Sequence, residues 1–246
     1  MRVIGHFIAL SFLFVLLGSC SKDESQGTKP KSTSINKILP LGASRVEGSV
    51  PEYQSFRYAL WKDLIEGNWT FDFIGTQTDP FDYPTFRDGS FDPDHEGRAG
   101  WTSGQILEEL NTWLEESGSP DIVLFSSPGG NDALEGLPYN EAVKNIREII
   151  ELLQRNNPDV TILIEQMAPA RSDMMMGDLQ RYFNQLQQEV RDIATNKSTL
   201  KSPIIAVDMH TGFTDNLLAD DVHYNEAGAE FIADKYYKAL ESVLQD

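Results

Sequence analysis

The chain has 246 residues, of which 40% are hydrophobic and 24% charged, a composition typical of a folded globular protein and not of a disordered one. Its 20 Lys and Arg stand against 38 Asp and Glu, and the resulting net charge of −18 argues against a general nucleic-acid-binding surface, because phosphate would be repelled. The single cysteine excludes a disulfide within the chain and a cysteine-based zinc site.

The first nineteen residues have the composition of a secretory signal. Arg2 supplies a positive charge, and the apolar run over 8–17 is too short to span a bilayer as a permanent helix. The run ends in Leu-Gly-Ser-Cys, which resembles a bacterial lipobox in which cleavage precedes Cys20 and the thiol then carries lipid. An ordinary signal peptide with a chance cysteine is the alternative. Residues 20–34 have no apolar side chain after Cys20 and are predicted to form a flexible tether.

Lipid would be the only membrane contact of such a chain. Loss of residues 1–19 removes Arg2 and no acidic residue, so the mature chain would carry a net charge of −19 and could not bind anionic lipid through a basic patch. We therefore expect a lipid-anchored protein of the bacterial cell envelope, at the outer membrane or the cell surface.

From residue 35 to residue 246, short apolar runs alternate with amphipathic segments of helix length. The runs are rich in Ile, Val, Leu and Phe, as expected of strands that are buried on both faces. Predicted strands cover 35–41, 71–74, 122–126, 160–166 and 204–208, and predicted helices cover 54–66, 103–116, 139–155, 178–194 and 225–244. Five strands joined by crossover helices predict a single α/β domain in three layers (α/β/α), with a doubly wound, five-stranded parallel sheet.

Residues 76–100 form the one long stretch without a regular pattern. A loop of this length in a compact domain is usually functional. Asp92, Asp94 and Glu96 echo the start of a calcium loop, but Ser103 stands where the bidentate acid is required, so no metal site is predicted. In open parallel sheets, ligands bind beyond the carboxyl ends of the strands, and the residues that follow each strand are therefore the main candidates.

Two glycine-containing turns follow the first and third strands. Ser44 lies in the first, Gly-Ala-Ser-Arg at 42–45, where an exposed hydroxyl suits a nucleophile; a plain turn or N-cap serine is the alternative. Asn131 lies in the second, Gly-Gly-Asn-Asp at 129–132, and its amide could donate a hydrogen bond into a cleft; a hairpin-type turn is the alternative.

Asp220 and His223 precede the last predicted helix. A carboxylate three residues before a histidine can accept a hydrogen bond from Nδ1 and leave Nε2 free to act as a base. A histidine without such a partner is more often structural. Asp221 is only two residues from His223, so Asp220 is the preferred orienting acid. His210, two residues after Asp208, is predicted to be structural or to face substrate.

The serine turn, the Gly-Gly-Asn-Asp turn and the Asp-x-x-His pair follow one another in the order typical of the SGNH (GDSL) hydrolase superfamily. The chain resembles that superfamily from about residue 38 to residue 240. The resemblance implies a flavodoxin-like SGNH hydrolase fold and no metal or organic cofactor. It also implies a catalytic triad of Ser44, Asp220 and His223, and an oxyanion hole formed by the N–H groups of Ser44 and Gly100 with the side chain of Asn131.

Two residues next to Ser44 depart from the family pattern. Ala43 replaces an aspartate that supports the site by hydrogen bonding, which bears on efficiency more than on identity. Arg45 is unusual beside the nucleophile, and we expect it to point to solvent.

Residues 94–106, with Trp61 and Trp113, resemble the carbohydrate esterase branch, which removes acetyl groups from polysaccharides. The implied function is hydrolysis of acyl esters, acetyl esters above all, on a carbohydrate substrate. A lipase or simple-ester acylhydrolase and a non-catalytic glycan-binding surface lipoprotein are the alternatives. Met174–Met176 provide the only candidate for an apolar lid and are expected to pack at the start of a helix instead.

Overall fold

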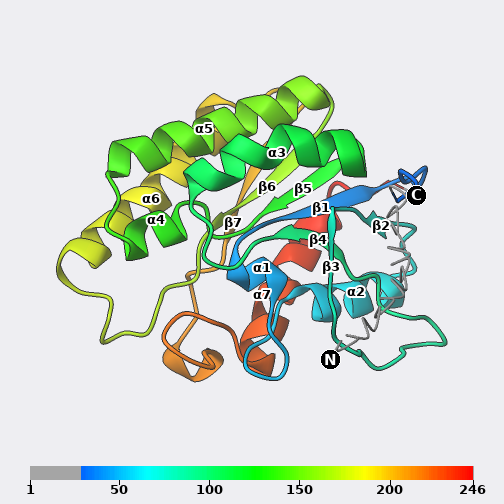
Figure 1. Ribbon diagram of the computed structural model, residues 1–246, viewed down its shortest axis with the longest axis horizontal. Helices are drawn as coiled ribbons and strands as arrows, with labels where there is room; N and C mark the ends of the chain where they lie inside the picture. Colours follow the sequence, from blue (N-terminus) through cyan, green and yellow to red (C-terminus); the bar gives the residue numbers. More distant parts are fainter. Residues whose placement is uncertain (1–28, 246) are drawn as a thin grey trace, which may run out of the picture.

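The computed structural model of the protein describes residues 29–245 (Figure 1). The predicted signal peptide, Cys20 and most of the predicted tether lie outside the described residues. Within residues 29–245, no helix combines the length and apolar composition needed to cross a membrane.

A sheet of seven strands forms the middle layer. Its strands are β1 (Lys37–Gly42), β2 (Asp72–Phe73), β3 (Gln77–Thr78), β4 (Asp94–Gly97), β5 (Ile122–Phe125), β6 (Thr161–Gln166) and β7 (Ile204–Asp208). The parallel strands β1, β5, β6 and β7 lie side by side in that order. On the other side of β1, β2 pairs with its first half and β4 with its second half. The predicted parallel α/β fold is confirmed, and each of the five predicted strands is found within two residues at its ends.

The sheet has two more strands than predicted, because β3 and β4 lie in the stretch expected to be irregular. β4 is parallel to β1, and β3 pairs with β4 antiparallel. The sequence of β4 is Asp-His-Glu-Gly, and all four residues are buried. An apolar run is the usual sign of a buried strand. Here the buried side chains are polar and are paired by residues from other segments, so the sign is missing.

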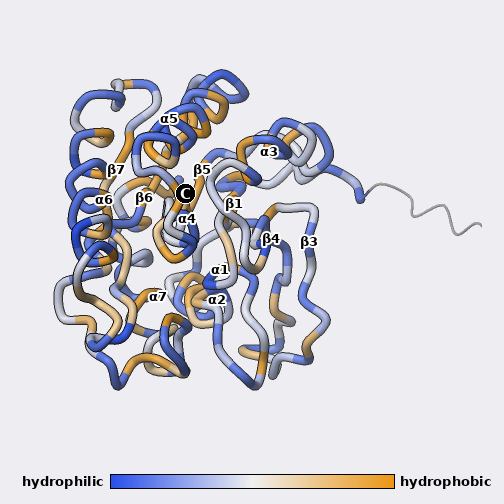
Figure 2. The backbone as a smooth tube through the Cα atoms, turned by 60° about the vertical axis from the view of Figure 1, so that its left-hand side comes forward, coloured by the Kyte–Doolittle hydropathy of each residue, from blue (hydrophilic) through white to orange (hydrophobic). Residues whose placement is uncertain are grey.

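Helices cover both faces of the sheet (Figure 1). The five predicted helices are α2 (Arg57–Glu66), α3 (Ser103–Ser117), α5 (Tyr139–Asn156), α6 (Gly177–Asn196) and α7 (Glu226–Leu240). Helices α3, α5 and α6 pack on one face, around Leu39 and Leu41 of β1, whereas α2 and α7 pack on the other, around Ile38. The alternation of these β1 residues between two cores follows the two-residue period of a strand. Figure 2 shows hydrophobic residues on the sheet and hydrophilic ones on the outer sides of the helices.

Three short helices were not predicted: α1 (Ser44–Glu47), α4 (Gly130–Leu134) and the 3-10 helix η1 (Asp215–Leu217). Each is shorter than two turns and therefore cannot show a helical period in its sequence. Helices α1 and α4 begin just after β1 and β5, at the carboxyl edge of the sheet, and they carry Ser44 and Asn131.

Candidate active site

Ser44 is the first residue of α1, directly beyond the carboxyl end of β1. The turn before it requires Gly42, because a Cβ atom there would lie 2.8 Å from Val46 Cγ2 and 2.9 Å from the Ser126 carbonyl oxygen. Glycine thus allows α1 to fold back against the end of β1 and beside β5. The side chain of Ser44 is half-buried and lines a pocket.

Asp220, His223 and Ser44 form an unbroken chain of hydrogen bonds. His223 Nδ1 lies 2.7 Å from Asp220 Oδ2, and His223 Nε2 lies 2.9 Å from Ser44 Oγ. The second carboxylate oxygen of Asp220 accepts the N–H groups of Val222 at 2.8 Å and of His223 at 2.7 Å. Burial raises the pKa of the Asp220 carboxyl, but these N–H groups and the imidazole outweigh it, so that the pKa lies below its usual range. Asp220 is therefore a carboxylate that fixes the orientation of His223.

Asp221, in contrast, turns away from the imidazole. Its carboxylate pairs with Arg171 Nη2 at 2.8 Å, and its carbonyl oxygen accepts the Arg171 N–H. Of the two adjacent acids, the structure places only Asp220 against His223.

Tyr53 covers one face of the His223 ring. The ring centroids are 3.9 Å apart and the planes differ by 14°, which is a stacked arrangement. Burial, followed by the charges of Glu47 and Asp220, raises the pKa of the Tyr53 hydroxyl. This contact was not predicted, because the two residues are far apart in the chain and Tyr53 belongs to no motif.

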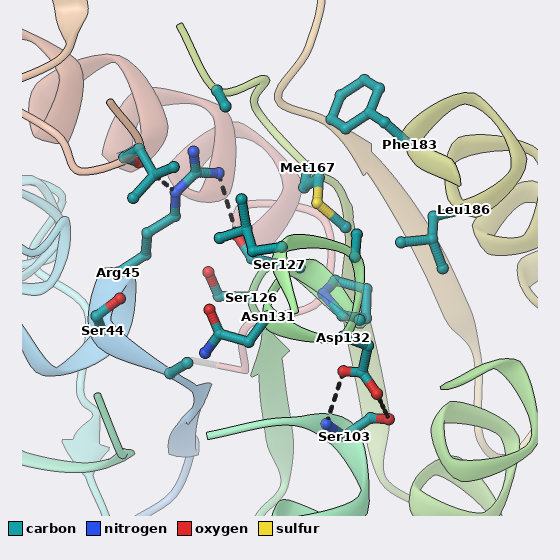
Figure 3. A pocket seen from close by; sticks show the side chains of 18 of the residues that line it. Ser44, Arg45, Ser103, Ser126, Ser127, Asn131, Asp132, Met167, Phe183 and Leu186 are labelled. Carbon is teal, nitrogen blue, oxygen red and sulfur yellow. Dashed lines mark hydrogen bonds between the residues drawn. The ribbon is translucent and has the colours of Figure 1, made fainter. Parts of the chain in front are cut away.

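Two of the three predicted oxyanion donors, Ser44 and Asn131, line the same pocket, and Gly100 precedes Trp101, which binds Asn131. Among the described residues, the N–H groups of Ser44 and Gly100 have no acceptor. Asn131 Nδ2 donates one hydrogen bond to the Trp101 carbonyl oxygen at 2.8 Å, which ties the asparagine to the loop that carries Gly100. Figure 3 shows the Ser44 hydroxyl and the Asn131 amide turned toward the same space. The arrangement can supply hydrogen bonds to an oxygen atom placed next to Ser44 Oγ.

Carboxylates hold the two loops that carry these donors. Glu47, on α1, accepts the N–H of Ala99, which precedes Gly100. Asp132 accepts the Ser103 N–H at 2.8 Å and the Ser103 hydroxyl at 2.7 Å, and so attaches α4 to the start of α3 (Figure 3). Asp132, for which no role was predicted, thus lines the pocket and binds the first turn of α3.

The expectation that Arg45 points to solvent is wrong. Arg45 is only 9% exposed. Its Nε donates to the Val222 carbonyl oxygen at 2.8 Å, and its Nη1 donates to that of Ala168 at 2.8 Å. The guanidinium carbon also lies 4.8 Å from the centre of the Tyr224 ring. Backbone carbonyls from two distant loops converge on this position, and such convergence cannot be predicted from the residues next to Ser44.

The pocket beside Ser44 has a polar end and an apolar end (Figure 3). Ser44 and Asn131 line the polar end, and the apolar wall includes Met167, Phe183 and Leu186. Trp101 also lines the pocket.

Of the other aromatic residues and methionines considered as substrate contacts, some line the pocket and others lie in the core. Trp61 and Trp113 are 3% and 5% exposed and belong to the core, so they cannot stack on a ligand. Met175 packs against the core and lines the pocket, whereas Met176 is 64% exposed at the start of α6. His210 is exposed, and its N–H donates to Asp208 Oδ1 at 2.9 Å.

A second, buried histidine–aspartate pair joins His95 of β4 to Asp79. His95 Nε2 is 3.2 Å from Asp79 Oδ1, and His95 Nδ1 accepts the Gly97 N–H at 2.9 Å. Arg57 Nη2 also contacts Asp79, at 2.7 Å. Burial and the nearby Arg57 lower the pKa of His95 to about 4, so the ring is neutral near neutral pH. Within residues 29–245, no three His, Cys, Asp or Glu side chains are grouped as metal ligands would be.

Comparison with known proteins identifies solved structures with a similar fold and a family to which the chain belongs. The structure is similar to a family 3 carbohydrate esterase from Talaromyces cellulolyticus (TM-score 0.72, 24% identity, 85% of this chain and 98% of that one). It is also similar to a family 3 carbohydrate esterase from Clostridium thermocellum (TM-score 0.68, 26% identity, 86% and 100%). A GDSL-like lipase from Bacteroides thetaiotaomicron is more distant (TM-score 0.59, 16% identity, 85% and 89%). No curated protein sequence matches the chain significantly.

The model of the GDSL-like Lipase/Acylhydrolase family matches residues 82–231, more than half of the chain. The matched segment contains Gly100, Asn131, Asp220 and His223 and begins after Ser44. With these motifs and the fold in place, the chain belongs to the GDSL-like lipase/acylhydrolase family and is an SGNH-type ester hydrolase.

Proposed function

We propose that the protein is a serine esterase that removes acyl groups, acetyl groups above all, from carbohydrate esters by way of an acyl-enzyme. The observation that carries this proposal is the continuous line from Asp220 through His223 to Ser44 Oγ, with 2.9 Å between the imidazole and the hydroxyl. A general base must lie within hydrogen-bonding reach of the proton that it removes, and His223 does.

In the proposed reaction, Ser44 Oγ attacks the ester carbonyl carbon while His223 Nε2 takes the hydroxyl proton. Asp220 stabilises the resulting imidazolium. When the tetrahedral intermediate collapses, the bond to the alcohol breaks and His223 returns the proton to the departing oxygen. Water then attacks the acyl-enzyme by the same route, which releases the acid and restores Ser44.

The negative oxygen of the tetrahedral intermediate would bind to the N–H groups of Ser44 and Gly100 and to the amide of Asn131. These donors are fixed before substrate arrives, because Glu47 and the Trp101 carbonyl hold the loops that carry them. Preformed donors of this kind stabilise developing charge without reorganisation during the reaction.

Carbohydrate esters are proposed as substrates because of the likeness to carbohydrate esterases from Talaromyces cellulolyticus and Clostridium thermocellum. Trp101 supports this choice, since it lines the pocket together with Asn131 and is of the residue type that stacks on sugar rings. The apolar wall of Met167, Phe183 and Leu186 favours a second candidate, a simple-ester or lipid acylhydrolase with a longer acyl chain.

A substrate panel separates the candidates. Hydrolysis of p-nitrophenyl esters of increasing acyl length and release of acetate from acetylated xylan would be measured for the wild type and for Ser44→Ala. Preference for acetyl esters and activity on the xylan support the carbohydrate esterase. Preference for long acyl chains supports the second candidate. Equal rates in wild type and Ser44→Ala would identify a non-catalytic glycan-binding protein.

We also propose a lipid anchor at Cys20, because the lipobox-like sequence contains the only cysteine. Metabolic labelling with a fatty acid, followed by cell fractionation, tests it. The wild type should carry label and sediment with envelope membranes, whereas Cys20→Ser should be unlabelled; a labelled variant would refute the anchor.

A further inference from the structure

Arg45 contacts three of the loops that build the candidate active site. Its Nε binds the Val222 carbonyl oxygen, immediately before His223. Its Nη1 and Nη2 bind the carbonyl oxygens of Ala168 and Pro169, at 2.8 and 3.2 Å, in the loop after β6. Because Arg45 follows Ser44 in α1, one side chain connects the nucleophile directly to the loop of the general base.

The third loop is the one that leads to Asn131. Arg45 Nη1 lies 3.3 Å from Ser127 Oγ, and Ser127 in turn donates its N–H and its hydroxyl to Glu165 Oε2, at 2.7 and 3.2 Å. Glu165 is fully buried on β6. Ser127 adopts a left-handed backbone, with φ of 47°, and its carbonyl oxygen accepts the N–H of Gly130 in the first turn of α4. The contacts of Arg45 therefore extend to the turn that presents Asn131.

Ala43 has no polar group with which to bind neighbouring loops. We propose that Arg45 is a positioning residue of the esterase, whose guanidinium holds the His223 loop and the Ser127 loop in register with Ser44. The proposal rests on the serine esterase mechanism given above.

A guanidinium is suited to this position because its planar fork donates several hydrogen bonds in fixed directions. A lysine would place one compact ammonium group and could not reach all the acceptors. Methionine would fill the space and donate nothing. Small displacements of reacting groups cost much rate, about a hundredfold for 1 Å. The effect of losing Arg45 should therefore appear in kcat and much less in KM for a small ester.

The test compares Arg45→Met and Arg45→Lys with the wild type in hydrolysis of p-nitrophenyl acetate. The expected result for Arg45→Met is a fall in kcat of about tenfold to a hundredfold, with a much smaller change in KM. Arg45→Lys should recover little of this loss. The Nδ1–H proton of His223, followed by NMR, should lose its sharp signal in Arg45→Met, because the His223 loop is no longer held.

Asn36→Ala is the matched control for stability. Asn36 is a buried polar residue at the other end of β1, and its Nδ2 binds the carbonyl oxygens of Thr70 and Gln245 at 2.8 and 2.7 Å. Asn36→Ala should lower the melting temperature and leave kcat unchanged. An equal loss of kcat in Asn36→Ala would mean that activity follows stability, and would overturn the role of Arg45.

Two further results would also overturn the proposal: an unchanged kcat in Arg45→Met, or full activity in Arg45→Lys. Ser44→Ala, measured in the same assay, separates this failure from failure of the mechanism. If Ser44→Ala is inactive and Arg45→Met is fully active, only the role of Arg45 is wrong. If Ser44→Ala remains active, the serine mechanism itself is wrong.

Discussion

Two histidine–aspartate pairs in this chain have similar contacts but differ in whether the histidine can act as a base. His223 contacts Asp220 through Nδ1 and turns Nε2 toward the Ser44 hydroxyl. His95 contacts Asp79 through Nε2, but its Nδ1 accepts the N–H of Gly97. The His95 side chain is 2% exposed and that of His223 is 20% exposed.

The difference shows that contact with a carboxylate does not by itself make a histidine a base. A base needs a free nitrogen that faces both a hydroxyl and the space where substrate binds. Both nitrogens of His95 are occupied by the protein, and burial together with Arg57 keeps the ring neutral. His95 joins β4 to the rest of the fold, whereas His223 has one nitrogen available for proton transfer.

The largest expected loss of kcat follows from substitution of Ser44, His223 or Asp220. Ser44→Ala and His223→Ala should each lower kcat by about four orders of magnitude or more, because neither proton transfer nor acyl-enzyme formation remains possible. Asp220→Asn should approach the same loss, since His223 would lose its orienting charge. Steady-state kinetics with p-nitrophenyl acetate measures this, and unchanged unfolding curves exclude a folding defect. Substantial activity in His223→Ala would remove the distinction between the two histidines.

Asn131→Ala should have the next largest effect. Loss of one oxyanion donor typically lowers kcat by about 10²–10³, and KM should change little because the donor acts mainly on the transition state. Asn111→Ala, on the exposed side of α3, is the matched control and should keep full activity. A normal kcat in Asn131→Ala would show that the other two donors suffice.

His95→Gln tests the buried pair through stability. The folded protein keeps His95 neutral down to a pH of about 4, whereas the unfolded chain takes up the proton near 6.5. The unfolded state thus binds more protons between these values, and the wild type loses stability as the pH falls through them, by up to about 3 kcal/mol. The stability advantage of the wild type over His95→Gln should shrink over the same range, measured by urea unfolding. A pH-independent difference would contradict a buried neutral His95.

Tyr53→Leu should have the smallest effect. The stacked ring holds the imidazole in place and would attract the imidazolium that forms during the reaction by a cation–π interaction, which is worth roughly 0.5–1 kcal/mol at a partly exposed site. We expect a twofold to fivefold fall in kcat, as about 1 kcal/mol corresponds to a factor of about five. Tyr53→Phe keeps the ring and should retain full activity. Equal losses in Tyr53→Leu and Tyr53→Phe would assign the effect to the hydroxyl group and not to stacking.

Part of the fold and of the candidate site could be predicted from the sequence. The apolar runs of β1, β5, β6 and β7 each carry a local signal, and all were found. Turns and spacing made Ser44, Asp220 and His223 candidates, and the resemblance to SGNH hydrolases assigned them to a triad. The structure places them in contact, and their catalytic role stays a prediction. The predicted lipid anchor lies in residues that the structure does not describe.

Local patterns were enough to place five strands, five long helices and the residues available for chemistry, because apolar periodicity and short motifs depend on near neighbours in the chain. Three features became apparent only from the three-dimensional packing: Arg45 is buried, Tyr53 stacks on His223, and β4 joins the sheet with buried charges. The reason is physical. A polar side chain can be buried only if partners satisfy it, and here those partners come from segments far away in the sequence.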